Sequence, residues 1–346
     1  MKKPPAASML VTDGGLLTTV QDRGRRWTGS FGVSPSGYAD WLSARAANRL
    51  VANDDGAALI ETTLTGAEFV LNCDARLALT GASADFCISD RPGRAWRCEI
   101  VRAGERVRIG PARTGLRNYL ALAGGVRVPA VMDSASTDVA AGFGGYGGRG
   151  LKAGDVVPIG EPDASALRWS AYSSPASRPP AASEGRRSEG KTLRRAENGG
   201  CAAADHVLRR PAVLRILPGP HANVLGESMP QALAASVYRV SLRSNRQGLR
   251  LEGTPLPVGD GTGVLSGGVC AGCVQMLSDG LPVVLLSEHQ TTGGYAVAAC
   301  VIAADLPRAA QLRPFDEVSF AKVTQTDARQ ALFHALDLIS SDSLRA

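Results

Sequence analysis

The sequence predicts a mainly β fold in two lobes, with a few short helices. Three observations support this prediction. The chain has 346 residues, which is enough for two domains of ordinary size. Forty of these residues are glycine, which favours frequent turns over long helices. Between residues 57 and 157, most apolar runs are short and end at Gly, Pro, Asp or Asn, a pattern typical of an antiparallel barrel or sandwich.

The lobes are predicted at residues 9–160 and 212–340, joined by a linker at 161–211. The linker is rich in Ser, Pro, Ala, Arg and Gly and poor in apolar residues, which is typical of a partly disordered segment. Residues 178–210 hold eight basic and four acidic residues, a large part of the net charge of +6. We therefore expect a solvated basic linker and no nucleic-acid partner.

The composition also predicts the cellular setting. No apolar run reaches the length of about 20 residues that spans a bilayer, so no membrane association is expected. The first ten residues, MKKPPAASML, lack the apolar stretch of a secretory signal. Seven scattered cysteines indicate reduced thiols, so we expect a cytoplasmic protein.

The first lobe is expected to begin with two short strands at 9–11 and 16–20, around an Asp13-Gly14-Gly15 turn. A polar loop follows and ends at Asp40, which is predicted to cap a helix with apolar residues near helical spacing up to Leu50. In the strand at 116–120, Arg117 and Tyr119 are expected on one face. The glycine cluster at 139–154 lacks the phosphate-loop pattern and is predicted to be a surface loop.

The second lobe is predicted to contain strands at 213–217, 238–242, 297–302 and 318–323. Short apolar runs, in places alternating with polar residues, support these strands. A short helix is expected at 225–235 and an amphipathic helix at 326–339. Arg246, Gly248 and Arg250 alternate on one predicted face, so the two arginines could clamp a carboxylate or phosphate. Equally, they could be surface charges paired with Glu252 or Asp260.

The nine residues SEHQTTGGY, at 287–295, follow the buried strand expected at 282–286. Gly293 and Gly294 would let backbone N–H groups approach a ligand, and Gln290, Thr291 and Thr292 add donors and acceptors. Such a loop suits an anion or an amide. The alternative is a tight turn that closes a hairpin.

Other patterns offer little chemistry. Cys270-x-x-Cys273 is the only close cysteine pair, and without further zinc ligands or a helical setting it favours buried structural thiols over metal or redox chemistry. No metal site is therefore predicted. No G-x-S-x-G elbow and no nucleotide-binding motif is present. The residues alone predict a small-molecule binder or one part of an enzyme.

The motifs taken together resemble a known family. In the first half these are VQDRGRRW, GVSPSGYAD, the pair Ala58 and Glu61, LALTGA, GLRNYLALAGGV and SAST. In the second half they are LPGPH, SNRQGLRLEG, GCVQM and QTTGGY. In this order they resemble the biotin-dependent carboxyltransferase, or allophanate hydrolase subunit 2, family, which includes the C-type subunit of 5-oxoprolinase and the KipA proteins. The resemblance covers nearly all of the chain outside residues 1–8 and the linker.

The resemblance implies two cyclophilin-like β-barrel lobes and a protein partner of the subunit 1 type, which 5-oxoprolinase has as its B-type subunit. It implies ATP-dependent opening of 5-oxoproline to glutamate, together with a lactam-opening A-type subunit. ATP would be used by the complex, since this chain has no ATP motif. The alternatives are a subunit of a urea carboxylase system, where biotin would carry the carboxyl group, and a non-catalytic regulatory binder of the KipA type.

The resulting site prediction has two parts, and no catalytic residue is assigned. The small amide substrate is predicted to contact Gln290, Thr291, Thr292, Gly293, Gly294, Tyr295, Arg246, Arg250 and Gln275. A second polar site or partner interface is predicted at Gln21, Asp22, Arg23, Ser36, Asp40, Arg117 and Tyr119. The sequence departs from the family pattern at Gly267, Glu288, His289 and Phe315, which stands where the family has a glycine.

Overall fold

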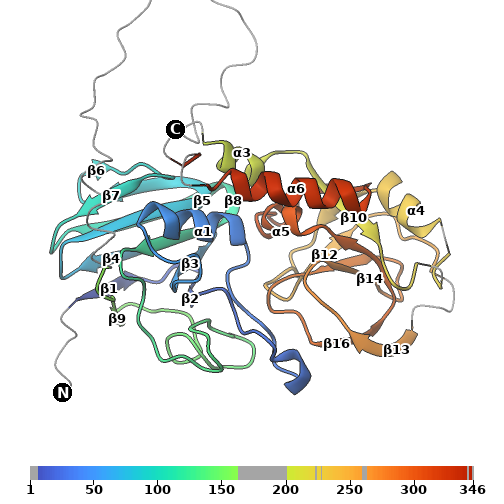
Figure 1. Ribbon diagram of the computed structural model, residues 1–346, viewed down its shortest axis with the longest axis horizontal. Helices are drawn as coiled ribbons and strands as arrows, with labels where there is room; N and C mark the ends of the chain where they lie inside the picture. Colours follow the sequence, from blue (N-terminus) through green and yellow to red (C-terminus); the bar gives the residue numbers. More distant parts are fainter. Residues whose placement is uncertain are drawn as a thin grey trace, which may run out of the picture.

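The computed structural model describes residues 7–162, 201–222, 224–226, 228–258, 263–340 and 343–344. Two β lobes lie side by side, with helices along one edge of both (Figure 1). The mainly β prediction with few helices is confirmed. None of the helices in the described ranges is long and apolar enough to cross a bilayer.

The first lobe is a curled nine-stranded sheet. Its strands are β1 (Ser8–Asp13), β2 (Leu17–Gln21), β3 (Leu59–Thr63), β4 (Ala67–Leu71), β5 (Ala75–Ile88), β6 (Arg91–Pro92), β7 (Cys98–Val101), β8 (Arg106–Leu122) and β9 (Val156–Pro158). The order β2-β3-β8-β4-β1-β9 forms its main path, and β5 pairs with β6, β7 and β8. The long strands β5 and β8 pair antiparallel from Leu77–Leu122 to Ile88–Val107, with shifts in register between Gly81 and Phe86.

The second lobe closes into a seven-stranded barrel. Its order is β10-β17-β14-β15-β12-β11-β18, and β10 and β18 pair in parallel. These strands are β10 (Ala212–Pro218), β11 (Val237–Val240), β12 (Gly248–Glu252), β14 (Cys273–Met276), β15 (Pro282–Leu285), β17 (Val297–Val301) and β18 (Glu317–Lys322). Two further strands, β13 (Gly263–Gly268) and β16 (Thr292–Tyr295), form a separate antiparallel ribbon. The barrel that the family resemblance implied is therefore closed in this lobe, whereas the first lobe is a curled sheet.

Helices fill the space between and beside the lobes. They are α1 (Trp41–Leu50), α3 (Ala202–Leu208), α4 (Met229–Ala235), α5 (Leu306–Ala310) and α6 (Gln325–Asp337), with 3-10 turns η1 (Gly29–Phe31) and η3 (Ala303–Asp305). The predicted cap is present, since the Asp40 carboxylate accepts the N–H of Ser43 at the start of α1. Buried residues of α1, α3 and α6 share one apolar cluster with Ile302, so this helical layer packs against both lobes.

Most of the predicted linker, 163–200, lies outside the described residues. Its last part, which the sequence placed in the linker, contains helix α3, whose Ala203, Ala204 and Val207 are fully buried. Arg210 then pairs with Asp316 of the second lobe. The chain at 202–210 is thus packed on the protein, because its apolar alanine, valine and leucine side chains form one face of a short helix.

Candidate functional site

Charged residues from both lobes meet at the junction between them. Six of them form what we call the junction cluster: three arginines and three acids, all at least about nine-tenths buried. They are Arg25, Arg117, Arg246, Glu61, Asp138 and Glu288. Buried charges are tolerated where opposite charges and hydrogen bonds compensate them, so the pairings within this cluster decide its role.

Arg246 is the side chain that links the lobes. Its Nε donates to Glu288 at 2.6 Å, Nη2 donates to the carbonyl of Gly37 at 2.5 Å, and Nη1 pairs with Glu61. Burial alone would lower the pKa of Arg246, but the carboxylates of Glu61 and Glu288 outweigh burial and raise it. Arg246 therefore stays charged and has a partner on each nitrogen.

The loop before β12 explains how Arg246 reaches this position. The Asn245 carboxamide oxygen accepts the N–H groups of Gln247 and Gly248, which closes a tight turn. The carbonyl of Arg246 then accepts the N–H of Glu288 at 2.9 Å. Because the two backbones are hydrogen-bonded, the arginine and the glutamate side chains can meet above them.

This arrangement differs from the predicted two-arginine clamp. Arg246 is 4% exposed and pairs with residues far away in the sequence, not with Glu252. The other suggested partner, Asp260, lies outside the described residues. Arg250 lies within β12 with an exposed side chain. The predicted alternation fails because Arg246 stands before the strand begins at Gly248, so it does not follow the strand's period.

Asp22 organises the first-lobe loop that carries Arg25. Its carboxylate accepts hydrogen bonds from the hydroxyls of Ser134 and Ser136, both at 2.6 Å, and from the N–H groups of Ala135 and Gly24. The neighbouring Gln21 amide donates to Thr19 and Thr137. The side chains of Asp22 and Gln21 thus hold loops together, whereas Arg23 is exposed to solvent.

Arg25 is buried but only partly satisfied. Its Nη2 donates to the carbonyl of Ser136 at 2.6 Å, and its guanidinium lies 4.4 Å from the centre of the Phe143 ring. Its Nε and Nη1 are buried without a hydrogen-bond partner. Burial lowers the pKa of Arg25, while the charges of Asp138, Asp22 and Glu288 act against this. A buried guanidinium with two free N–H groups is suited to binding an anion.

The glycine cluster predicted to be a surface loop supports this arginine. Gly144 is buried with φ +71°, and a Cβ there would lie 2.2 Å from Nη2 of Arg25. Only glycine allows the loop to approach so closely in this conformation. Two hydroxyls, those of Ser36 and Ser287, are also buried without a partner. Ser36 follows Pro35, whose carbonyl accepts the N–H of Arg25 at 2.7 Å, and Ser287 precedes Glu288.

Asp40, Tyr119 and Arg117 form a second contact between the lobes. The Asp40 carboxylate accepts a hydrogen bond from Nε2 of Gln311 at 2.8 Å. The Tyr119 hydroxyl accepts a hydrogen bond from the backbone N–H of Asp40, also at 2.8 Å. Arg117 donates to the carbonyl of Ala310 and lies 3.6 Å from Glu61. These three residues are 0–2% exposed, so they join the lobes of this chain rather than form a surface for a partner. Burial raises the pKa of Asp40 to about 6.

The structure brings Gln275 together with the residues at 290–295. The Gln290 amide donates to the carbonyl oxygen of the Gln275 side chain at 3.0 Å. Nε2 of Gln275 in turn donates to the backbone carbonyl of Tyr295 at 3.5 Å. Thr292–Tyr295 forms β16, which pairs with β13. Residues 287–291 are therefore turn and loop, as the sequence predicted, whereas residues 292–295 are a paired strand. His289 is buried, with Nδ1 2.6 Å from the carbonyl oxygen of Gln290.

Sequence reasoning missed several members of this region. Arg25 sits among Arg23 and Arg26 and has no local feature that distinguishes it. Glu61 offered a signal, since an acid inside the apolar strand β3 must find a buried partner. Gln311 offered none, because its partners Asp40 and Arg117 are about two hundred or more residues away.

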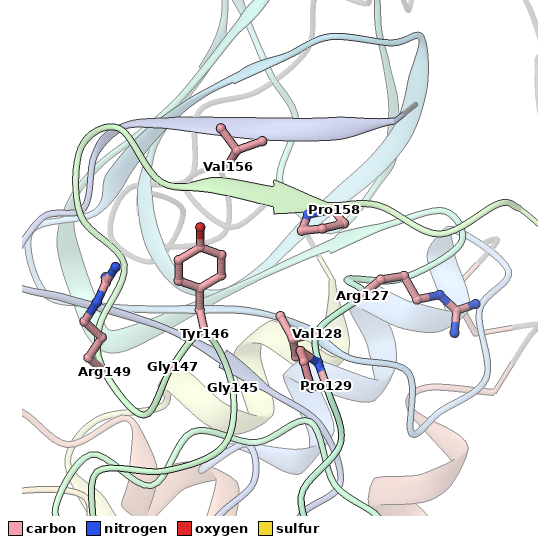
Figure 2. Close-up of a pocket in the computed structure, with 9 residues that line it drawn as sticks. All are labelled: Arg127, Val128, Pro129, Gly145, Tyr146, Gly147, Arg149, Val156 and Pro158. Atoms are coloured by element: carbon pink, nitrogen blue, oxygen red, sulfur yellow. The ribbon is translucent and has the colours of Figure 1, made fainter. Parts of the chain in front are cut away.

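A cavity of about 310 Å³ lies elsewhere in the first lobe. It is lined by the residues that Figure 2 labels: Arg127, Val128, Pro129, Gly145, Tyr146, Gly147, Arg149, Val156 and Pro158. Arg149 is already paired with Asp155 at 2.7 Å. None of the predicted site residues lines it. Within the described ranges, no group of His, Cys, Asp or Glu is arranged to hold a metal ion.

Comparison with known proteins agrees with the architecture. Residues 31–322 match the family model of the carboxyltransferase domain, subdomain A and B. The chain is 34% identical to the C-type subunit of 5-oxoprolinase from Escherichia coli, over 92% of each protein. It is 32% identical to urea amidolyase of Lachancea kluyveri over 92% of this chain but 17% of that protein.

Solved structures show the same fold within longer chains. The crystal structure of the Kluyveromyces lactis urea amidolyase matches with a TM-score of 0.79 and 25% identity, over 98% of this chain and 20% of that one. The structure of TTHA0988 matches with a TM-score of 0.72 and 31% identity, over 93% of this chain and 56% of that one. With lobes, motif order and family model in agreement, the chain belongs to the family of carboxyltransferase domains built from subdomains A and B.

Proposed function

We propose that this chain is the C-type subunit of a 5-oxoprolinase complex. In that complex it would act with a B-type and an A-type subunit in the ATP-dependent opening of 5-oxoproline to glutamate. The observation that carries the proposal is the match to the C-type subunit of the E. coli enzyme, which spans 92% of both chains. The C-type subunit of the Haemophilus influenzae enzyme matches at 29% identity over a similar share.

The substrate chemistry fits two groups of residues near Glu288. 5-Oxoproline carries a carboxylate and a ring amide. The free N–H groups of Arg25, with the hydroxyls of Ser36 and Ser287, are the donors proposed for the carboxylate. The amides of Gln275 and Gln290, with the backbone of Thr291 to Gly294, are proposed for the ring amide. Ser287 of the first group and Gln290 of the second belong to one short segment, which supports a single ligand that contacts both groups.

Donors held in a buried, preorganised site could also stabilise an anion that forms as the amide is attacked. A cyclophilin-like barrel does not itself imply a reaction, so the proposal rests on these side chains and not on the fold.

We assign the ATP site to the partner subunits. The glycine-rich loop at 139–154 packs against Arg25 at Gly144 and against Thr137 at Gly145, so protein atoms occupy the space beside these two glycines. It also does not lead into a helix, as a phosphate-binding loop would.

The longer relatives support the need for partner polypeptides. The chain spans about half of the TTHA0988 chain and one fifth of the K. lactis enzyme, so in both cases this domain occurs beside further polypeptide. The relatives named C-type subunits support separate subunits as such neighbours in the proposed complex.

The test is reconstitution with the A- and B-type subunits encoded in the same genome. We expect ATP-dependent release of glutamate from 5-oxoproline only when all three proteins are present. An intact three-protein complex that releases no glutamate would refute the proposal, and partner binding without turnover would favour a regulatory role of the KipA type.

A second candidate function is carboxyl transfer to urea. The observation that favours it is the match to three proteins named urea amidolyase or urea carboxylase, at 27–32% identity. This function requires a biotin-bearing carboxylase as partner. Urea-dependent consumption of carboxybiotin by the chain with such a partner, and none of 5-oxoproline, would establish it in place of the first proposal.

A further inference from the structure

Three thiols lie together at one end of the barrel. Cys270 precedes β14, Cys273 begins it, and Cys300 is the register partner of Cys273 on β17. The sulfur atoms of Cys270 and Cys273 are 3.7 Å apart. Cys270 is exposed, whereas Cys273 is buried. All three are free thiols. At this distance the sulfur of the exposed Cys270 is in van der Waals contact with the sulfur of the buried Cys273.

The turn between the first two cysteines is shaped for a disulfide. The N–H of Cys273 donates to the carbonyl of Cys270 at 3.1 Å, which brings the first and fourth residues of the turn together. Such turns hold these two Cα atoms within about 7 Å, and disulfides need about 4.4–6.8 Å. Gly272 has φ +93°, and a Cβ there would lie 2.8 Å from the carbonyl oxygen of Val301. The glycine thus allows a turn that a larger residue would strain.

The surroundings favour a thiolate within the group. Hydrogen bonds from Cys270 and then from Cys300 lower the pKa of Cys273, and the charge of His289 acts in the same direction. The corresponding pKa of Cys270 is raised, first because it is the donor to Cys273. One proton is therefore lost more readily from this group than from an isolated thiol, and thiolates are the reactive form of cysteine.

The turn is also connected to the proposed amide-binding residues. The N–H of Val269 donates to the carbonyl of Thr291 at 3.1 Å, and Gly268 pairs with Thr292 across β13 and β16. A change in the backbone at Cys270 would be passed to this ribbon within one or two residues. The backbone of the cysteine turn and the backbone of Thr291 are thus connected by hydrogen bonds.

We propose that Cys270 and Cys273 are a reversible oxidation site, at which hydrogen peroxide converts the two thiols to a disulfide and so shifts the ribbon that carries Thr291. The Cys273 thiolate, whose proton has passed to solvent, attacks peroxide. An S–O bond forms on Cys273, the O–O bond breaks, and the departing hydroxide takes the proton of Cys270 to become water. The Cys270 thiolate then attacks the Cys273 sulfenic acid, forming the S–S bond and releasing hydroxide, which takes up a proton to become a second water. Two thiols lose two electrons and two protons in total, and peroxide is reduced to two waters.

The first test does not depend on the proposed function. The purified full chain is treated with hydrogen peroxide, free thiols are blocked under denaturing conditions, and peptides are mapped by mass spectrometry. We expect a linkage between Cys270 and Cys273 that dithiothreitol reverses, formed about tenfold faster than oxidation of Cys87, in line with the role of thiolate character in reactivity. A linkage of Cys273 to Cys300, or none between Cys270 and Cys273, overturns the proposal.

The variants separate this chemistry from general oxidation. Cys270→Ser must abolish the linkage, and Cys87→Ser must leave it unchanged. Cys300→Ser removes one hydrogen bond to the Cys273 thiolate and should slow the reaction severalfold without preventing it. If Cys87→Ser abolishes the linkage as well, the oxidation is not specific to this turn and the assignment fails.

The second test addresses the ribbon, and its link to activity rests on the proposed function. Amide hydrogen exchange of peptides covering 287–295 should differ between the oxidised and the reduced chain, and Cys270→Ser should show no such difference. Unchanged exchange in a chain shown to carry the disulfide overturns the coupling. Since this measurement needs no partner subunits, its failure is distinct from failure of the glutamate assay.

Discussion

Two arginines at the lobe junction differ in how their donors are used. Arg246 has a partner on each of its nitrogens, whereas Arg25 has two buried N–H groups with none. An unsatisfied buried donor costs on the order of 1–3 kcal/mol, which a bound anion would recover. We therefore propose that Arg246 has a structural role and that Arg25 binds the ligand.

Replacement of Arg25 tests that assignment. In the reconstituted complex, Arg25→Gln should raise the KM for 5-oxoproline at least tenfold, because loss of a charged hydrogen bond costs about 1.5–3 kcal/mol. Arg26→Gln changes an exposed arginine one residue away and should leave KM unchanged. Equal KM values for both variants would remove Arg25 from the substrate site.

Asp40 should make stability depend on pH. Its folded pKa of about 6 lies above its ordinary value of 3.8, so the folded protein binds the proton more tightly than the unfolded chain does. This contribution is fully present below pH 3.8 and is lost as the pH rises to about 6. It amounts to at most roughly 3 kcal/mol, since one pKa unit corresponds to about 1.36 kcal/mol.

The measurement is thermal unfolding of the wild type and of Asp40→Asn between pH 4 and pH 7. The wild-type melting temperature should fall relative to that of the variant as the pH rises through this range. Asp90→Asn, which changes an exposed acid, should follow the wild type. A constant difference between wild type and Asp40→Asn at all pH values would contradict the assignment.

Phe315 occupies a conformation that favours glycine. Its φ is +73°, and its side chain is 59% exposed, so little packing offsets the steric cost of about 1–2 kcal/mol. Phe315→Gly relieves this cost but gives the unfolded chain more freedom, worth roughly 0.5–1 kcal/mol. We expect a net gain of about 0.5 kcal/mol in urea unfolding, with no gain for Phe315→Ala, which retains the Cβ.

At the scale of secondary structure, the sequence predicted those helices and strands that have a capping residue or a clear apolar spacing. Helix α1 follows from Asp40 as a cap and from the spacing of its apolar residues, and it forms as predicted. Strands β11 and β17 overlap the ranges that apolar runs indicated. Strand β16 was not predicted, because Thr-Gly-Gly-Tyr has neither alternation nor strong β propensity and is fixed by pairing with β13.

Gly293 tests the role of that ribbon. A Cβ at this position would lie 2.5 Å from Nε2 of Gln275, so Gly293→Ala should displace the Gln275 amide from Gln290. We expect a loss of turnover of tenfold or more with the complex still assembled. The matched variant is Gly268→Ala, on the paired strand, where a Cβ meets nothing within 4 Å. Similar turnover for the two variants would show that this amide pair does not bind substrate.

At the scale of the whole molecule, the sequence predicted the β class and the family but not the junction. Arg246 and Glu61 are 185 residues apart, and Gln311 and Asp40 are 271 apart. No pattern along the chain encodes such pairs, because each depends on how the complete lobes dock. The substrate site predicted from the sequence therefore contained Arg246. Arg25 became a candidate only once the structure showed that two of its nitrogens are buried without a hydrogen-bond partner.

Arg246→Ala should weaken the connection between the lobes. It leaves Glu61 and Glu288 buried without their shared partner, a loss typically worth about 3–5 kcal/mol. Urea unfolding followed by fluorescence and by circular dichroism should coincide for the wild type and separate for the variant. Arg250→Ala, on the exposed side of β12, should change stability by less than about 0.5 kcal/mol. A coincident, unshifted transition in Arg246→Ala would contradict a linking role for this arginine.

The parallel pairing of β10 with β18 has a consequence for synthesis on the ribosome. The barrel begins with β10 and is closed by β18, at Glu317–Lys322, so it cannot close until β18 has emerged. The last strand of the first lobe, β9, ends at Pro158, about 160 residues before β18. Until the barrel forms, Glu61 and Asp40 of the first lobe lack their partners Arg246 and Gln311. We expect the first lobe to fold before the barrel does, and to dock with the barrel only after β18 has emerged.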